Sequence, residues 1–216
     1  MSTWYKFALR KHMMRFDPRV VINVDINDSN LEASITSIIS SSIVKGLDVI
    51  GMVSYNPQVP YRAMDISKKQ NVDLFIIPGQ IYKTIDGFDV IIYNSLEKYP
   101  DGMDIKSLLI KTESNGHKTL VYNLGKQKSN ILYKLGESGI KPTLVEIFSS
   151  KSYGYMYVKT NTYEVVSSGA ENSSELDKTN IYSHVPRKDL ENMNLLPPGQ
   201  GEEYIPGYLE KVNVGN

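Results

Sequence analysis

Few side chains in this sequence are of the types that usually carry out chemistry. The 216 residues include no cysteine and only three histidines, His12, His117 and His184. Without cysteine there is no thiol nucleophile, no disulfide and no thiolate metal ligand. The three histidines lie in unrelated contexts, so each is expected to be a solvated or capping residue. The Gly-x-Ser-x-Gly, P-loop and His-Glu-x-x-His motifs are absent too, so the common hydrolase and nucleotide-binding patterns are not indicated.

A tyrosine cluster is the next candidate for a binding function. Tyr153, Tyr155 and Tyr157 alternate along one segment, and Tyr163 follows in the next. Aromatic side chains over a basic groove can stack the bases of single-stranded nucleic acid. Tyrosines two residues apart also mark one face of a β-strand, and this simpler interpretation is favoured.

The two ends of the chain carry large apolar side chains on segments that lack a regular hydrophobic pattern. These side chains are Trp4, Tyr5, Phe7, Tyr204, Ile205, Tyr208 and Leu209. Exposed clusters of this kind usually mark contact sites, and an extended segment that orders on binding can wrap a large surface. We therefore predict that both ends bind other proteins of an assembly. For the N-terminal segment the alternatives are phosphate contact by its cations and a free end. For the C-terminal tail they are a disordered end and a lid that folds back over its own domain.

Between these ends, apolar β-branched runs alternate with helical patterns. Strands are predicted at residues 20–26, 47–53, 72–77, 89–93, 119–122 and 143–148, with shorter ones at 153–158 and 162–166. Helices are predicted from Ser29 to just before Gly46, and at 60–71, 104–113 and 128–135. Ser29 and Glu32 have the spacing of a capping box. Ile50, Ile76, Ile91 and Val121 are expected to be buried on the strands.

This order predicts an α/β fold, because strands separated by helices of such length pair in parallel through right-handed crossovers. The length suits one domain with arms. Lys and Arg total 24 against 24 Asp and Glu, so the net charge gives no attraction to nucleic acid or membranes. The sequence contains neither an apolar signal core at its start nor a run of about 18 apolar residues. We expect a cytoplasmic or virion-associated protein that is not secreted. The frequent Ser, Asn, Lys, Ile and Tyr are typical of AT-rich genomes, which is compatible with a phage origin.

Two stretches of the sequence resemble the PHP (polymerase and histidinol phosphatase) superfamily. Residues 45–56 read KGLDVIGMVSYN, against approximately KGLDVIAITDHN in that family, and residues 76–81 read IIPGQI against VIPGQEI. The likeness extends over about residues 20–190. It implies a distorted PHP-like (β/α) barrel of about seven strands at residues 19–196, with an N-terminal arm at 1–18 and an extended C-terminal tail at 197–216.

The family's metal-ligand positions hold other residues in this chain. By the resemblance they correspond to Asp25, Asn27, Ser54, Tyr55, Ile81, Asn123 and Glu171, with Phe88 near a further histidine position. PHP-type hydrolysis relies on a metal cluster that generates hydroxide and clamps phosphate oxygens, and imidazole and carboxylate ligands hold such metals. Ile81 presents hydrocarbon where the family has a bridging glutamate. The resemblance therefore implies that the multinuclear site is lost, and we expect no metal and no other cofactor.

A remnant site of oxygen ligands is the alternative. If the family fold holds, five carboxylates lie near the C-terminal mouth of the barrel: Asp25, Asp28, Asp89, Glu146 and Glu171. Oxygen ligands suit one Mg²⁺ or Ca²⁺ ion. The favoured interpretation is instead that Asp28 caps a helix, that Glu146 faces outward from its strand and that the others are solvated.

Three functions remain open at this point. The favoured one is a non-catalytic PHP-like scaffold that serves as a structural or interaction subunit of a larger assembly, such as a phage particle. The second is a metal-dependent phosphoesterase or nuclease that uses the residual carboxylates. The third is a nucleic-acid-binding accessory factor that kept an electropositive mouth without its metals.

Overall fold

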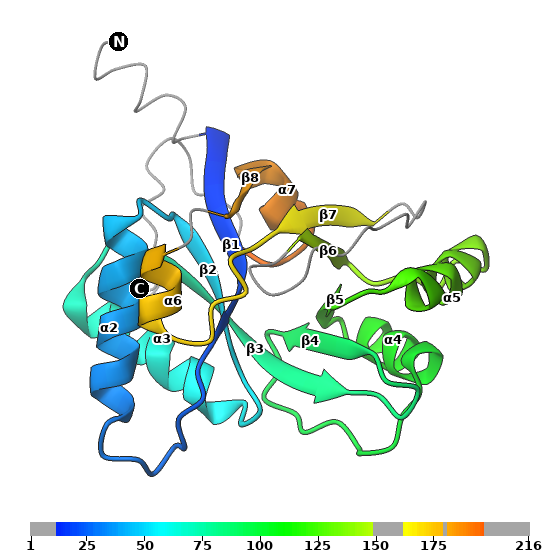
Figure 1. Ribbon diagram of the computed structural model, residues 1–216, viewed down its shortest axis with the longest axis horizontal. Coiled ribbons are helices and arrows are strands. Elements are labelled where there is room, and N and C mark those ends of the chain that lie inside the picture. Colours follow the sequence, from blue (N-terminus) through cyan, green and yellow to red (C-terminus); the bar gives the residue numbers. More distant parts are fainter. Residues whose placement is uncertain (1–11, 149–161, 179–180, 197–216) are drawn as a thin grey trace, which may run out of the picture.

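The computed structural model describes residues 12–148, 162–178 and 181–196. They form an α/β fold in which one mixed sheet curls into a nearly closed barrel with helices between the strands (Figure 1). The strands are β1 (Met13–Val21), β2 (Val49–Ser54), β3 (Phe75–Lys83), β4 (Asp89–Tyr93), β5 (Lys118–Tyr122), β6 (Leu144–Phe148), β7 (Tyr163–Val166) and β8 (Ser183–Pro186). The helices are α2 (Leu31–Val44), α3 (Gln58–Gln70), α4 (Ile105–Ser114), α5 (Lys126–Glu137), α6 (Ser173–Lys178) and α7 (Arg187–Asn192).

The eight strands lie in the order β7-β6-β5-β4-β3-β2-β1-β8. β1, β2 and β3 are parallel, and so are β5, β6 and β7, but β4 is antiparallel to both β3 and β5, and β8 is antiparallel to β1. The prediction of parallel pairing was therefore wrong at β4. The turn from β3 to β4, closed by the bond from Thr84 N to Phe88 O, is too short for a crossover.

The pair β4 and β5 is antiparallel even though α4 lies between the two strands. After β4 the chain first returns to the β3–β4 turn, where Ile85 N donates to Met103 O at 3.1 Å and Ile105 N donates to Asp86 Oδ1 at 3.2 Å. Helix α4 then runs back before β5 begins. Because of this loop, β5 runs antiparallel to β4, whereas a direct crossover through α4 would have made the two strands parallel.

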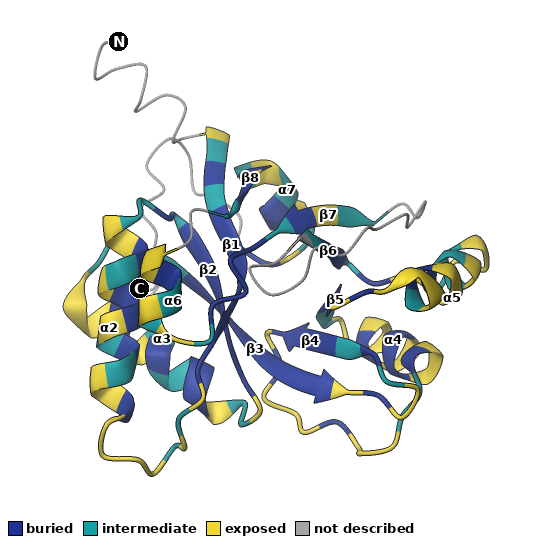
Figure 2. Ribbon diagram, in the orientation of Figure 1, coloured by how far each residue is buried: buried dark blue, intermediate teal, exposed yellow. Residues whose placement is uncertain are grey.

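Two groups of helices cover the outside of the barrel. Helices α2, α3 and α6 pack on β1 to β3, where Ile50 and Ile76 are buried, and α4 and α5 pack on β4 to β6, where Val121 is buried (Figure 1). Ile91 is buried inside the barrel. The predicted burial of these four side chains is confirmed. In Figure 2 the strands are mostly buried, while the helices expose the faces that point away from the sheet.

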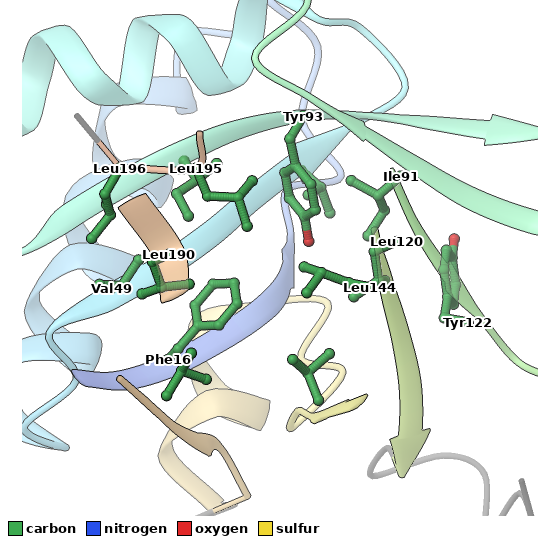
Figure 3. Packing of buried hydrophobic residues seen from close by; sticks show 14 of the residues in the cluster. Phe16, Val49, Ile91, Tyr93, Leu120, Tyr122, Leu144, Leu190, Leu195 and Leu196 are labelled. Carbon is green, nitrogen blue, oxygen red and sulfur yellow. The ribbon is translucent and has the colours of Figure 1, made fainter. Parts of the chain in front are cut away.

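The amino-terminal end of the barrel interior is filled with hydrocarbon. Phe16 and Val49 sit opposite each other near the starts of β1 and β2, and Leu190 of α7 packs on them together with Leu195 and Leu196. Figure 3 shows these five side chains gathered in one group. Helix α7 and the two residues that end the described chain therefore close this end of the barrel.

The first strand begins earlier than predicted. β1 covers Met13–Val21, so residues 13–18, which were assigned to the N-terminal arm, belong to the sheet, and residues 22–26 form a loop instead. The start was missed because Asp17 and Arg19 interrupt the apolar pattern. Both are buried in the fold, where they bind Ser168 and Glu146 from far along the chain. Residues 1–11 of the arm and the whole tail at 197–216 lie outside the described residues.

The predicted capping box is absent from the first helix. α2 starts at Leu31, and its N-cap is Asn30, whose side chain makes no capping hydrogen bond. Asp28 Oδ1 accepts from Asn30 N at 2.8 Å in the turn before the helix, so the capping role predicted for Asp28 was also wrong. Glu32 pairs with Arg62 on α3 instead.

The last part of the described chain differs most from expectation. β3 continues to Lys83 rather than ending at Ile77, and α6, β8 and α7 were not predicted. β7 pairs in parallel with β6; its expected hairpin partner, residues 153–158, lies outside the described residues. None of the described helices is long and apolar enough to cross a membrane.

Candidate functional site

A buried ion pair occupies the carboxyl-terminal half of the barrel interior. Arg19 of β1 and Glu146 of β6 form a two-pronged contact, with Nε 2.8 Å from Oε2 and Nη2 3.1 Å from Oε1. Their side chains are 5% and 2% exposed. Glu146 lies two residues after the interior Leu144, so strand alternation turns it inward. The prediction that Glu146 faces outward was therefore wrong.

Neighbouring side chains complete the hydrogen bonding of the pair. Ser167 Oγ donates to Glu146 Oε2 at 2.8 Å. The Tyr122 ring lies against the guanidinium, with its centre 4.5 Å from Arg19 Cζ, a cation–π geometry. Burial alone would lower the pKa of Arg19, but the charge and the hydrogen bonds of Glu146 raise it above the ordinary value. The Arg19 guanidinium therefore stays charged.

Asp17 is a second carboxyl group in this interior, and it is 1% exposed. Its Oδ2 accepts from Ser168 Oγ at 2.6 Å and its Oδ1 accepts from Arg19 N at 3.1 Å. Burial raises the pKa of Asp17 to about 7, although these two hydrogen bonds act in the opposite direction. A pKa near neutrality is one mark of a general acid or base. Both oxygens of Asp17 are, however, engaged within the protein and shielded from solvent.

A β-bulge positions these residues. The register of β1 against β2 shifts between Asp17 and Val20, and the extra residue turns the Pro18 carbonyl into the barrel. Tyr93 Oη donates to that carbonyl oxygen at 2.5 Å. A Cβ atom at Gly51 would lie 2.0 Å from the same oxygen, so only glycine fits opposite the bulge. Burial raises the pKa of Tyr93 and of Tyr122, which keeps both phenols neutral.

The chain after β7 closes the barrel over this cluster. Ala170 O accepts from Val21 N at 2.7 Å, Ser167 forms an isolated bridge with Tyr182, and Ser183 Oγ accepts from Val166 N at 2.7 Å. Because Ser167 and Ser168 also bind Glu146 and Asp17, the polar cluster and the barrel closure are one hydrogen-bonded unit.

The positions matched to PHP metal ligands do not converge on a common point. Asp25 and Asn27 lie in the exposed loop after β1, where Asp25 Oδ1 accepts from Asn27 N at 3.1 Å. Ser54 ends β2 and accepts from Asn56 N at 3.3 Å, and Tyr55 after it is 68% exposed.

The remaining matched positions are equally dispersed. Ile81 is packed into the interior apolar cluster, and Phe88 is buried under the outer helices. Asn123 is exposed and donates from Nδ2 to Asp89 Oδ2 at 3.3 Å. Glu171 lines a pocket with Asn23 between the end of β1 and α2. Across the described ranges, no group of three or more His, Asp and Glu side chains is arranged to hold a metal ion.

The site residues that the sequence reasoning missed are Asp17, Arg19, Tyr93, Tyr122, Ser167 and Ser168. One signal was available. Two charged residues, Asp17 and Arg19, stand directly before the apolar run from Val20, so their side chains could lie at or inside the core. The predicted partner-binding residues Trp4, Tyr5, Phe7, Tyr204, Ile205, Tyr208 and Leu209 lie outside the described residues, as do Tyr153, Tyr155 and Tyr157.

Comparison with known proteins gives a likeness of fold. No family model matches the chain, and no curated protein matches it. Among solved structures, the crystal structure of PsfC from Pseudomonas syringae PB-5123 is similar, with a TM-score of 0.51 and 12% identity over 76% of this chain and 78% of PsfC. At this identity the match shows a shared fold and no shared activity.

Proposed function

We propose that this chain is a non-catalytic PHP-like scaffold that serves as a structural or interaction subunit of a larger assembly. The observation that carries the proposal is the Arg19–Glu146 ion pair. A metal cluster at the carboxyl ends of the strands needs an anionic, accessible set of ligands. In this chain the guanidinium of Arg19, which cannot lose its proton, occupies the interior. It lies against Glu146, the buried carboxylate of β6.

The energetics of the ion pair favour a structural role. Separating a buried pair leaves an uncompensated charge and is strongly unfavourable, so Glu146 is not free to bind a metal without a large rearrangement. Ile81 and Val53 add hydrocarbon to the same interior. Among the described residues, the charged side chains of the interior are thus paired with one another and with serine hydroxyls rather than open to a substrate.

The two alternative functions receive less support. A residual carboxylate site would need Asp25 and Asp28, which lie in an exposed loop, to join Glu146, which is buried and paired. Nucleic-acid binding at the mouth would need uncompensated positive charge, whereas the charge of Arg19 is balanced by Glu146.

Metal content and activity of the purified full chain test the non-catalytic role. We expect no stoichiometric zinc, manganese or iron, and no phosphoester hydrolysis above background when Mg²⁺ or Mn²⁺ is added. A robust metal-dependent activity that Asp25→Ala or Glu146→Gln abolishes while the fold is retained would overturn the proposal.

Deletion of residues 197–216 tests the role in an assembly. If the tail binds partners, the truncated chain should melt at nearly the same temperature as the full chain but join the assembly less well. If the tail packs on its own barrel, the melting temperature should fall clearly. The tail contains Tyr204, Ile205, Tyr208 and Leu209, and replacing these four by serine is the matched variant of full length.

A further inference from the structure

A small basic pocket lies at the end of the barrel opposite the ion pair. It has a volume of about 270 Å³ and is bounded by α4, the starts of β5 and β7 and the chain just before β6. Its polar lining includes His117, Lys118, Lys141, Thr119 and Thr143, and Leu109, Pro142 and Met193 supply apolar surface. The size falls at the lower edge of the range for small-molecule sites.

Positive charge prevails among the side chains that line the pocket. Lys118 and Lys141 contribute two cations, and Glu113 is the carboxylate of the lining. Nearby, Lys111 Nζ lies 5.9 Å from the centre of the Tyr99 ring. Tyr163, another lining residue, donates its hydroxyl hydrogen to Asp189 Oδ2 at 2.7 Å, so a second carboxyl group stands behind the lining. Within the lining itself the two lysines outnumber the one carboxylate, and the ligand that suits this lining is an anion.

Two threonine hydroxyls are held in place at the pocket by reciprocal bonds. Thr119 N donates to Thr143 Oγ1 at 3.2 Å, and Thr143 N donates to Thr119 Oγ1 at 3.4 Å. Each hydroxyl oxygen is therefore an acceptor from the backbone and keeps its own hydrogen to donate. Among the hydrogen bonds of the described residues, none uses either hydroxyl hydrogen. A bound oxyanion would accept both.

His117 is oriented by Tyr99. Tyr99 Oη lies 2.6 Å from His117 Nδ1 and receives Asn115 Nδ2 at 3.4 Å. Burial raises the pKa of Tyr99, so the phenol is neutral and has one hydrogen to give. The contact with Tyr99 engages Nδ1, so Nε2 is the ring nitrogen of His117 that this contact does not use. His117 also lines the pocket.

We propose that this pocket binds the phosphate group of a small molecule. The ammonium groups of Lys118 and Lys141 and the hydroxyls of Thr119 and Thr143 are donors around one pocket. A planar carboxylate accepts mainly in its own plane, whereas a tetrahedral oxyanion accepts from several directions. The apolar side of the pocket leaves room for the organic part of a phosphate monoester. Phosphate binding here does not depend on whether the opposite end of the barrel is catalytic.

Calorimetric titration of the full chain at constant ionic strength tests the proposal. The probes are inorganic phosphate, glycerol 3-phosphate, acetate and glycerol. Binding of either phosphate compound is expected, and preference for glycerol 3-phosphate would assign the pocket to monoesters, while equal affinity would assign it to phosphate alone. Absence of binding up to about 10 mM phosphate, or equally tight binding of acetate, would overturn the proposal.

Variants connect the binding to this pocket. Lys141→Met should weaken phosphate binding about tenfold, the effect of one charge-assisted hydrogen bond, and Lys118→Met should act similarly. The matched control is Lys83→Met, an exposed lysine at the other end of the sheet. Equal weakening by all three substitutions would show a general charge effect and contradict the assignment.

Nuclear magnetic resonance of the imidazole nitrogens gives a readout that does not depend on folding of any variant. The Nε2 signal of His117 should shift on addition of phosphate, whereas His184, which is exposed on β8, serves as the internal reference. Unchanged His117 signals at saturating phosphate would place the anion elsewhere.

Discussion

The two ends of the barrel interior solve the same packing problem with opposite chemistry. At the amino-terminal end, Phe16, Val49 and Leu190 fill the space with hydrocarbon. At the carboxyl-terminal end, Arg19 and Glu146 fill it with charges that neutralise each other. The apolar end gains stability from burial alone. The polar end is acceptable only while every charge keeps its partner, so it is the less tolerant of single changes.

The largest effect is expected when one member of the ion pair is removed. Arg19→Met should lower the free energy of unfolding by about 3–5 kcal/mol, because the Glu146 carboxylate stays buried without its partner. The double variant Arg19→Met/Glu146→Gln should recover most of that loss, since no charge is left and the glutamine oxygen still accepts from Ser167. Denaturant unfolding measures both.

The exposed pair is the matched control for this prediction. Arg62 and Glu32 form a contact on the surface, with side chains 40% and 65% exposed, and Arg62→Met should cost less than about 1 kcal/mol. If Arg19→Met proved as mild as Arg62→Met, the polar end would not be the sensitive end of the barrel.

A somewhat smaller loss is expected at the apolar end. Leu190→Ala should lower the free energy of unfolding by about 3 kcal/mol through lost burial and an incompletely filled cavity. Leu190→Met, which keeps the volume, should cost less than about 1.5 kcal/mol. Thermal or denaturant melts of the pair would sharpen the comparison, and equal losses would mean that α7 does not pack as tightly as its burial indicates.

The pH dependence should distinguish the two ends as well. The pKa of Asp17 is raised to about 7 in the folded chain from 3.8, so between these values the folded state holds a proton that the unfolded state has released. The contribution of Asp17 to the free energy of unfolding is therefore most favourable below pH 3.8. It falls as pH rises through this interval, by at most about 1.4 kcal/mol per pH unit, and levels off above pH 7.

Asp17→Asn removes this dependence if Asp17 is its source. The amide cannot ionise and can still accept from Ser168, so the variant should show a flatter profile of unfolding free energy between pH 4 and 7. Arg19, Glu146 and Tyr93 also face this region. The pKa values of Arg19 and Tyr93 are both raised, so these two groups titrate above this interval. A variant that keeps the wild-type slope would assign the dependence to another group.

The smallest effect is expected in the loop after β1. Asp25 is exposed, and its Oδ1 accepts from the nearby Asn27 N. Asp25→Ala should therefore change the free energy of unfolding by less than about 0.5 kcal/mol. A loss as large as that of a buried residue would mean that this loop is tied to the barrel.

Local patterns predicted much of the regular structure. The strands around Ile50, Ile91 and Val121 and the helix with Leu108 and Leu109 are where the apolar spacing placed them. The strands are buried along nearly their whole length and the helix buries one face, so the apolar pattern reports the burial directly. The first part of β1 escaped prediction because Asp17 and Arg19 are buried with partners more than a hundred residues away, and no local pattern carries that information.

The candidate site shows the same division. The sequence indicated that Ile81, Tyr55 and Asn27 are poor replacements for metal ligands, which depends only on side-chain chemistry. It could not indicate that Glu146 turns inward. Both faces of that strand carry apolar side chains, so the sequence does not show which face points into the barrel.

Residue types alone therefore determined the α/β character of the chain, the absence of thiol chemistry and the apolar rows that build the sheet. The tertiary structure alone decided the direction of β4, the bulge at Pro18 and the partnership of Arg19 with Glu146. The physical reason is that hydrophobic burial is encoded at each residue, whereas a buried charge is stable only through a partner whose position depends on the whole fold.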